Sequence, residues 1–133
     1  MYSTKLNPDM QRYVAKCIVN NKGPKFVDFV VDTGAKYTCA SYMSINPKLL
    51  EEDFQDAESK TIGGIVAGQI MTIYQYHINQ LTIGTVDLGE RDIWIIFDKR
   101  VSDDVLGMDI LSDVFIFQNP EIRTLIFSKD TII

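Results

Sequence analysis

The sequence has few of the residues on which metal and nucleophile chemistry depend. Among 133 residues it has one histidine, His77, and two cysteines, Cys17 and Cys39. A zinc site would have one imidazole at most, a serine or cysteine nucleophile would have to use His77, and the spacing matches no zinc motif. Alternation over residues 72–78 places His77 on the solvent face of a strand. We therefore expect no metal, no cofactor and two buried or half-buried free thiols.

Long apolar runs and positive charge are also scarce. The longest uninterrupted apolar run covers residues 93–97, far short of the ~20 residues that span a bilayer. Residues 1–12 lack the apolar core of a signal peptide, so we expect a cytoplasmic protein without a membrane partner. Lys and Arg number 13 against 18 Asp and Glu, and the net charge of −5 argues against a nucleic-acid partner. The glycine-rich residues 63–68 match neither a P-loop nor a dinucleotide fingerprint.

The pattern that is present alternates β-branched and aromatic residues with period two, and turn residues interrupt it about every ten positions. Such a pattern is typical of an all-β barrel or sandwich. The length and the 46% of hydrophobic residues indicate one domain over residues 1–133. We expect strands over residues 12–19, 25–31, 71–78, 81–88, 93–97, 115–117 and 122–127, and short helices over residues 48–52 and 108–115.

The second expected strand leads directly to a carboxylate. Residues 26–31 are apolar on both faces except for one aspartate, so this strand should lie inside the fold and end at Asp32. Thr33, Gly34 and Ala35 follow. Taken alone, these residues also fit an ordinary Asx-type turn at the end of a strand.

Two further motifs occur later in the chain. A glycine-rich hairpin is expected over residues 61–71, and two apolar residues precede Gly107 just before the C-terminal helix. Together with Asp-Thr-Gly, these motifs resemble the retroviral-type aspartic proteases, the retropepsins and their cellular and bacterial relatives. The resemblance implies a closed all-β acid-protease barrel with one short C-terminal helix, one lobe per chain and a two-fold homodimer.

The resemblance also implies a function, an aspartic endopeptidase in which Asp32 is the catalytic residue. Hydrolysis of an amide without a metal needs a base to activate water and an acid to polarise the carbonyl. Two adjacent carboxyls that share one proton supply both. Because this sequence has one Asp-Thr-Gly, the second carboxyl must come from a second copy of the chain, and the other partner is a peptide or protein substrate.

Residues around Asp32 have supporting roles by the same resemblance. Thr33 would form the hydrogen-bonded grip between the two active-site loops, although its hydroxyl could instead bond its own backbone. Gly34 would let the loops approach closely, and Ala35 and Gly107 would support the loop. Asp109 is the main rival carboxylate, and we interpret it as a structural residue that complements a helix dipole.

The glycine-rich hairpin resembles the flap that closes over a bound peptide in this family. Ile62, Gly63, Gly64 and Ile65 would then bind substrate through their backbone groups. Ala67 stands where a further glycine is common. A simple glycine-rich turn without a lid function is the alternative.

One departure from the retroviral pattern indicates the branch of the family. Retroviral members often have an Arg after the late glycine that pairs with an acidic residue just after the catalytic motif. Here these positions hold Met108, Lys36 and Tyr37. The sequence therefore fits the cellular or bacterial branch better, and retroviral substrate preferences should not be transferred.

Two questions stay open at the level of sequence. A non-catalytic dimerisation or peptide-binding module that keeps this fold is the alternative to an enzyme, and the intact Asp-Thr-Gly favours the enzyme. The specificity pockets cannot be assigned from alternation alone. Five residues are candidates for pocket or core, with core favoured for each: Tyr74, Tyr76, Trp94, Ile95 and Phe97.

Overall fold

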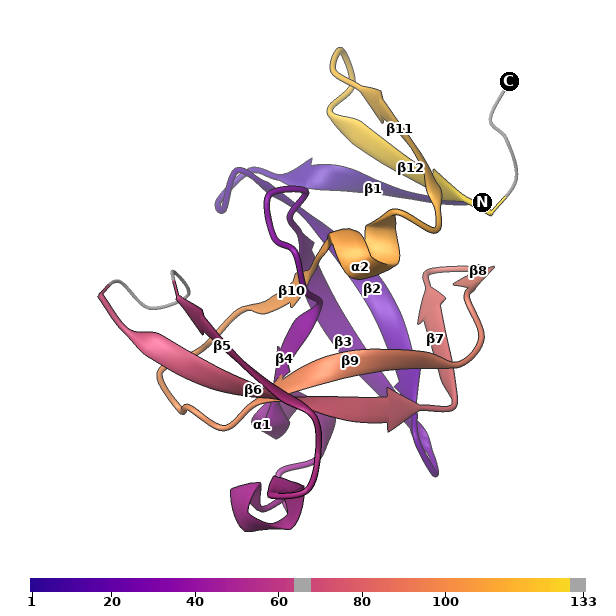
Figure 1. The fold of residues 1–133 in the computed structure, drawn as a ribbon. Helices are drawn as coiled ribbons and strands as arrows, with labels where there is room; N and C mark the ends of the chain where they lie inside the picture. Colours follow the sequence, from indigo (N-terminus) through magenta and orange to yellow (C-terminus); the bar gives the residue numbers. More distant parts are fainter. Residues whose placement is uncertain (64–67, 130–133) are drawn as a thin grey trace.

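The fold is built almost wholly of β-strands, as expected (Figure 1). The computed structural model describes residues 1–63 and 68–129. The strands are β1 (Tyr2–Asn7), β2 (Arg12–Asn20), β3 (Pro24–Val31), β4 (Cys39–Ser41), β5 (Ser59–Gly63), β6 (Ile70–Ile78), β7 (Gln80–Ile83), β8 (Val86–Asp87), β9 (Arg91–Ile96), β10 (Asp104–Leu106), β11 (Phe115–Asn119) and β12 (Thr124–Ser128). The helical segments are α1 (Tyr42–Ile45), the 3-10 segment η1 (Glu51–Phe54) and α2 (Met108–Leu111).

The strands form one continuous sheet that does not close on itself, so the expected closed barrel is wrong. Its order is β11-β12-β1-β2-β3-β10-β4-β9-β6-β5, and β7 joins β2 to β8 beside this path. Within the described residues, β11 pairs only with β12 and β5 only with β6, which leaves an edge at each end. Period-two alternation is the same in an open and a closed sheet, so the sequence did not distinguish them.

The hairpin of β2 and β3 confirms the expected central element. The two strands pair in antiparallel register from Val14 opposite Val30 to Asn20 opposite Pro24. The other edge of β3 pairs in parallel with β10, so β3 lies inside the sheet. Its outer end departs from the expectation, because Phe26 is 83% exposed.

Strand β9 separates two clusters of buried side chains. Ile93 and Ile95 belong to the main core, whereas Trp94 and Ile96 belong to a smaller cluster with Cys39. Successive side chains of a strand point to opposite faces, so both faces of β9 are covered. Both clusters also include buried side chains from β4 and β6, the two strands that pair with β9.

The first expected helix, over residues 48–52, is wrong. The α-helix in this region is the earlier α1, which Ser41 caps by accepting a hydrogen bond from the Met43 amide at 3.2 Å. Asn46 ends α1, and its amide donates to the Tyr42 carbonyl. The 3-10 segment η1 follows and buries Phe54. Polar side chains can either start or stop a helix, and the apolar stripe of residues 48–52 is too short to show which of the two happens here.

Two further boundaries differ from the sequence expectations. Helix α2 stops at Leu111 rather than continuing to residue 115, because the chain turns there and enters β11, which pairs with β12. The strand expected over residues 81–88 is broken at Gly84, whose positive φ of 59° makes a hairpin of β7 and β8. The closing hairpin of β11 and β12 is confirmed.

Strand β1 was not expected, because its composition is polar. It pairs with β12 along most of its length, and its last residues pair with β2. The Tyr2 ring stacks on Phe127 with centroids 5.9 Å apart and covers Gly84, where a side chain would collide with it. Partners far away in the sequence therefore determine this strand.

Candidate active site

Asp32 lies where β3 leaves the interior of the sheet. Its amide donates to the Leu106 carbonyl at 3.1 Å, which continues the parallel pairing of β3 and β10 by one residue. Its side chain is exposed, whereas Val30 before it is buried. The strand thus carries Asp32 from the core to the surface in a fixed position.

The turn after Asp32 orients the carboxylate. The Gly34 amide donates to Asp32 Oδ1 at 2.9 Å, and the Ala35 amide donates to the Asp32 carbonyl at 3.1 Å. This is the Asx-type turn that the sequence allowed. Among the hydrogen bonds of the described residues, none reaches Asp32 Oδ2, so one oxygen is held and the other is open to water or substrate.

Thr33 and Gly34 form the outward surface of the turn. Both are exposed, and within residues 1–63 and 68–129 the Thr33 hydroxyl makes no hydrogen bond to its own backbone. A Cβ on Gly34 would lie 3.2 Å from Asp32 Oδ1, which is a tight contact. A side chain at this position would therefore press on the carboxylate.

Thr38 is a supporting residue that the sequence reasoning missed. It is fully buried, and its Oγ1 accepts a hydrogen bond from the Gly107 amide at 3.0 Å and donates one to Asp109 Oδ1 at 2.6 Å. The Thr38 amide donates to Asp109 Oδ2 at 3.1 Å. Asp109 is thus a structural residue, as expected, but it acts through Thr38. A polar residue between apolar neighbours was the available signal.

Gly107 packs directly under the loop that follows Asp32. A Cβ here would lie 2.5 Å from the Tyr37 carbonyl oxygen and 3.0 Å from that of Ala35. The Met108 amide also donates to the Ala35 carbonyl at 2.8 Å. Only a residue without a side chain allows this approach of two backbones.

A cleft of about 700 Å³ opens beside Asp32. Ile62 and Gly63 from β5 line it together with Asp32, so the structure brings these parts of the expected site together. Gly64 and Ile65, like Ala67, lie outside the described residues. The other walls include residues that the sequence reasoning did not select: Leu6, Gln11, Arg12, Tyr13, Tyr37, Arg100 and Asp103.

The charged and sulfur groups of the cleft have restricted chemistry. Arg12 forms an ion pair with Asp103 at 3.0 Å, and Arg100 binds Asp98 in a pair that lowers the pKa of that carboxyl to about 2. Cys39 also lines the cleft, and burial and the charge of Asp109 raise its pKa to about 12. Its thiol stays protonated near neutral pH and is a poor nucleophile.

His77 and the candidate pocket residues lie elsewhere. The exposed His77 Nδ1 lies 3.0 Å from Asp92 Oδ1, and His77 is not among the cleft residues. None of the five candidates for pocket or core lines the cleft. Ile95 and Trp94 are buried, and Phe54 packs against the other three, which are half-buried: Tyr74, Tyr76 and Phe97.

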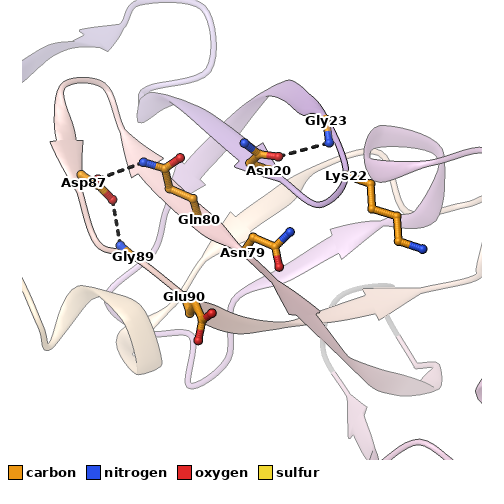
Figure 2. Close-up of a pocket in the computed structure, with 8 residues that line it drawn as sticks. All are labelled: Asn20, Lys22, Gly23, Asn79, Gln80, Asp87, Gly89 and Glu90. Atoms are coloured by element: carbon orange, nitrogen blue, oxygen red, sulfur yellow. Dashed lines mark hydrogen bonds between the residues drawn. The ribbon is translucent and has the colours of Figure 1, made fainter.

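A second hollow, of about 580 Å³, lies among turns (Figure 2). Its polar groups bond one another: Asn20 Oδ1 accepts from the Gly23 amide, and the Asp87 carboxylate accepts from the Gln80 side chain and the Gly89 amide. These bonds shape the turns and hold the pKa of Asp87 below its usual value. The groups form a turn cluster, and Asp32 does not line it.

The described residues were also compared with the requirements of a metal site and of a membrane-spanning helix. Within the part of the chain that the structure describes, no three His, Cys, Asp or Glu residues gather as a metal site would require. No described helix is long and apolar enough to cross a membrane. Asp32 lines the cleft with its Oδ1 held by the Gly34 amide.

Comparisons with known proteins agree with this geometry. Residues 15–113 match the model of a family described as "gag-polyprotein putative aspartyl protease". The fold is similar to the crystal structure of a retropepsin-like aspartic protease from Rickettsia conorii, with a TM-score of 0.65 and 16% identity. That similarity covers 95% of this chain and 88% of the rickettsial chain. A search of curated proteins finds no match.

Proposed function

The chain belongs to the gag-polyprotein aspartyl protease family, and on that premise we propose that it is an aspartic endopeptidase acting as a two-fold homodimer. The family resemblance inferred from the sequence motifs is confirmed. The observation that carries the proposal is the state of Asp32, which is held at Oδ1 by the Gly34 amide and open to the cleft at Oδ2.

The proposed mechanism uses a water held between the Asp32 carboxyls of two chains. Two carboxyls about 3 Å apart cannot both ionise, so the pair shares one proton. The ionised carboxyl takes a proton from the water, which attacks the peptide carbonyl, while the protonated one donates to the carbonyl oxygen. The pair titrates as a unit, and we expect an acidic, bell-shaped pH profile.

Among the described residues of the cleft, no free carboxyl accompanies Asp32, which supports a dimer. Among the described residues that line the cleft, the other acid is Asp103, and Arg12 engages it in an ion pair. The exposed Thr33 and Gly34 leave the loop accessible to a second copy. In the proposed dimer, Thr33 of each chain forms a hydrogen bond with the active-site loop of the other chain across the two-fold axis.

The hairpin of β5 and β6 is the proposed flap. It lies at an edge of the sheet and extends to one side of the molecule (Figure 1). Ile62 and Gly63 near its end line the same cleft as Asp32. Closure of this hairpin over an extended peptide would exclude bulk water from the cleft and leave the one water held between the two carboxyls.

Incubation with an unbiased peptide pool across pH 4 to 7 tests the proposal. We expect the wild type to cleave and Asp32→Asn to lose activity by about a thousandfold or more while keeping its fold, because the base is removed. Asp28→Asn, an exposed position on the same strand, is the matched control. Cleavage by Asp32→Asn at near the wild-type rate would rule out the assignment. Peptide binding without cleavage by the wild type would support the non-catalytic module.

Subunit mixing tests the shared site. With equal amounts of wild type and Asp32→Asn and random pairing, roughly a quarter of the dimers keep both carboxyls, so activity per wild-type chain should fall to about half. A mass-tagged variant verifies that subunits exchange. Full activity per wild-type chain after exchange would place the site within one subunit.

A further inference from the structure

Two lysine side chains gather around one aromatic ring beside the cleft. Lys36 and Tyr37 both line the cleft, and Lys36 Nζ lies 5.5 Å from the centre of the Tyr37 ring. Lys60 Nζ lies 5.4 Å from the same ring and 5.5 Å from the Trp94 ring. Two ammonium groups thus lie against the same aromatic ring. We call Lys36 and Lys60 the lysine pair.

The lysine pair differs from the arginines of the cleft in having no anion of its own. Arg12 is neutralised by Asp103, and Arg100 by Asp98. Within the described residues, no carboxylate oxygen lies within 4.0 Å of either lysine Nζ. The only partners of the two ammonium groups there are aromatic rings, which stabilise a cation weakly and leave its charge uncompensated.

Strand β5 places Lys60 beside Tyr37, a residue of the cleft wall, although Lys60 itself does not line the cleft. Lys60 and Ile62 are half-buried and alternate with the exposed Ser59, Thr61 and Gly63. Side chains two apart on a strand share a face, so Lys60 lies on the face of Ile62, which packs on the smaller cluster and lines the cleft. The lysine pair therefore borders the path of a peptide between the hairpin and the Asp32 loop.

We propose that the lysine pair forms a subsite that selects peptides with an acidic side chain close to the cleaved bond. The inference rests on the proposed function, because it assumes that a peptide occupies the cleft. A substrate carboxylate placed beside Tyr37 would supply the missing counter-charge to both ammonium groups. The chain as a whole carries a net charge of −5, so overall charge would repel such a peptide, and the preference must come from local contacts.

Matched peptides that differ by Glu or Gln at one position test the subsite. Each position flanking the cleaved bond of a substrate found in the pool is varied, and kcat/KM is measured. At the position that meets the lysine pair, we expect the wild type to prefer Glu about tenfold, from two ionic contacts of a few-fold each. Lys36→Gln and Lys60→Gln should each lower this preference about threefold, and the double variant should remove it.

Controls separate charge at the cleft from charge in general. Lys48→Gln changes an exposed lysine in the turn between α1 and η1 and should leave the Glu preference unchanged. Lys36→Glu should favour a Lys-containing peptide over its Gln counterpart, which a general loss of activity cannot produce. Thermal unfolding of each variant verifies that the fold is kept.

The outcomes distinguish this subsite from the proposed function. Cleavage by the wild type without a Glu preference at any position, or a preference that survives in the double variant, overturns the subsite and leaves the protease assignment intact. If the wild type cleaves no peptide, the protease assignment fails, and binding of fluorescent Glu-rich and Gln-rich peptide pools then tests the subsite. Equal affinity for the two pools overturns it, and tighter Glu binding that Lys36→Gln and Lys60→Gln abolish supports it.

Discussion

The loop that carries Asp32 and the hairpin of β5 and β6 meet at one cleft but are held in opposite ways. The loop, residues 32–38, is bound by β10, by the start of α2 and by β9 through backbone hydrogen bonds, and Thr38 adds buried side-chain bonds. The hairpin has the ladder between its own strands, and within the described residues its outer strand β5 has no other partner. One region is enclosed and the other is an edge.

The difference shows where the molecule tolerates change. A Cβ on Gly107, under the loop, would meet backbone atoms at 2.5 Å, whereas a Cβ on Gly63, in the hairpin, would lie 3.8 Å from the nearest atom. The closely packed atoms around a buried polar network have no room to shift when a side chain is enlarged, whereas the strands of an edge hairpin can shift toward solvent. The fold therefore holds the carboxylate in a closely packed region and places the hairpin at an edge of the sheet, where its outer strand has fewer contacts to lose.

Gly107→Ala should break the enclosed region and has the largest expected effect. The added methyl collides with the Tyr37 backbone, and we expect the free energy of unfolding to fall by about 3 kcal/mol or more, since neither backbone can move far. Urea unfolding followed by circular dichroism measures it. A loss below about 0.5 kcal/mol would show that the loop adjusts freely.

Thr38→Val tests the polar network without changing the volume of the side chain. It leaves the Gly107 amide without its acceptor and removes the hydroxyl that donates to Asp109 Oδ1, so we expect a loss of about 2–3 kcal/mol. Thr61→Val, an exposed position on β5, is the matched control and should change stability by less than about 0.5 kcal/mol. Equal effects at the two sites would remove the contrast between the regions.

Asp104→Asn tests the buried region through the pH dependence of stability. Asp104 is 8% exposed, and burial raises its pKa above the usual value while the Ser41 amide donates to its Oδ1 at 2.9 Å. A raised pKa in the folded state stabilises the protein below the pKa of an unfolded Asp, and this contribution is lost as the pH rises through the folded pKa. Asn keeps the acceptor and has no charge to bury.

The variant should therefore be more stable than the wild type at pH 7 and equally stable near pH 3. Urea midpoints between pH 3 and pH 7 measure the difference. Asp103→Asn, at the exposed neighbouring position, lacks burial and should not show this gain. A stability difference for Asp104→Asn that is the same at every pH would contradict the assigned cause.

Gly63→Ala should have the smallest effect and defines the tolerant side of the comparison. The methyl meets only ordinary contacts, and we expect the free energy of unfolding to change by less than about 0.5 kcal/mol. Chemical denaturation alongside Gly107→Ala makes the comparison direct. A loss comparable with that of Gly107→Ala would mean that the hairpin is as tightly enclosed as the loop.

The elements that the sequence predicted well are those set by local signals. The β2–β3 hairpin follows from its turn residues and apolar runs, and Asp32 stands where the buried strand ends. The strand around residues 71–78 was also found by its alternation, and the strand around residues 93–97 by its apolar run. Strand β1 was missed because its partner β12 lies far away in the sequence, and α2 was made too long because the chain after Leu111 turns into the hairpin of β11 and β12.

The candidate site divides in the same way. Asp32, the flanking turn and Gly107 could be found because they lie in short motifs of unusual composition. Arg12 and Asp103 could not, because an ion pair between β2 and the segment before β10 leaves no mark in the local pattern, and for Thr38 the local signal was only a polar residue between apolar neighbours. The lining of the cleft comes from segments far apart in the chain, and only the fold joins them.

The pairing of β1 with β12 sets the order in which the molecule can assemble. Tyr2 lies opposite Phe127, so almost the entire described chain separates two neighbouring strands. Joining such distant segments costs chain entropy before any contact is gained, and folds rich in such pairs form slowly. During synthesis, the β2–β3 hairpin can form while β12 does not yet exist. Leu6, on β1, is part of the cleft wall, and its amide donates to the Arg123 carbonyl at 2.8 Å just before β12, so this wall is complete only after β12 has been synthesised.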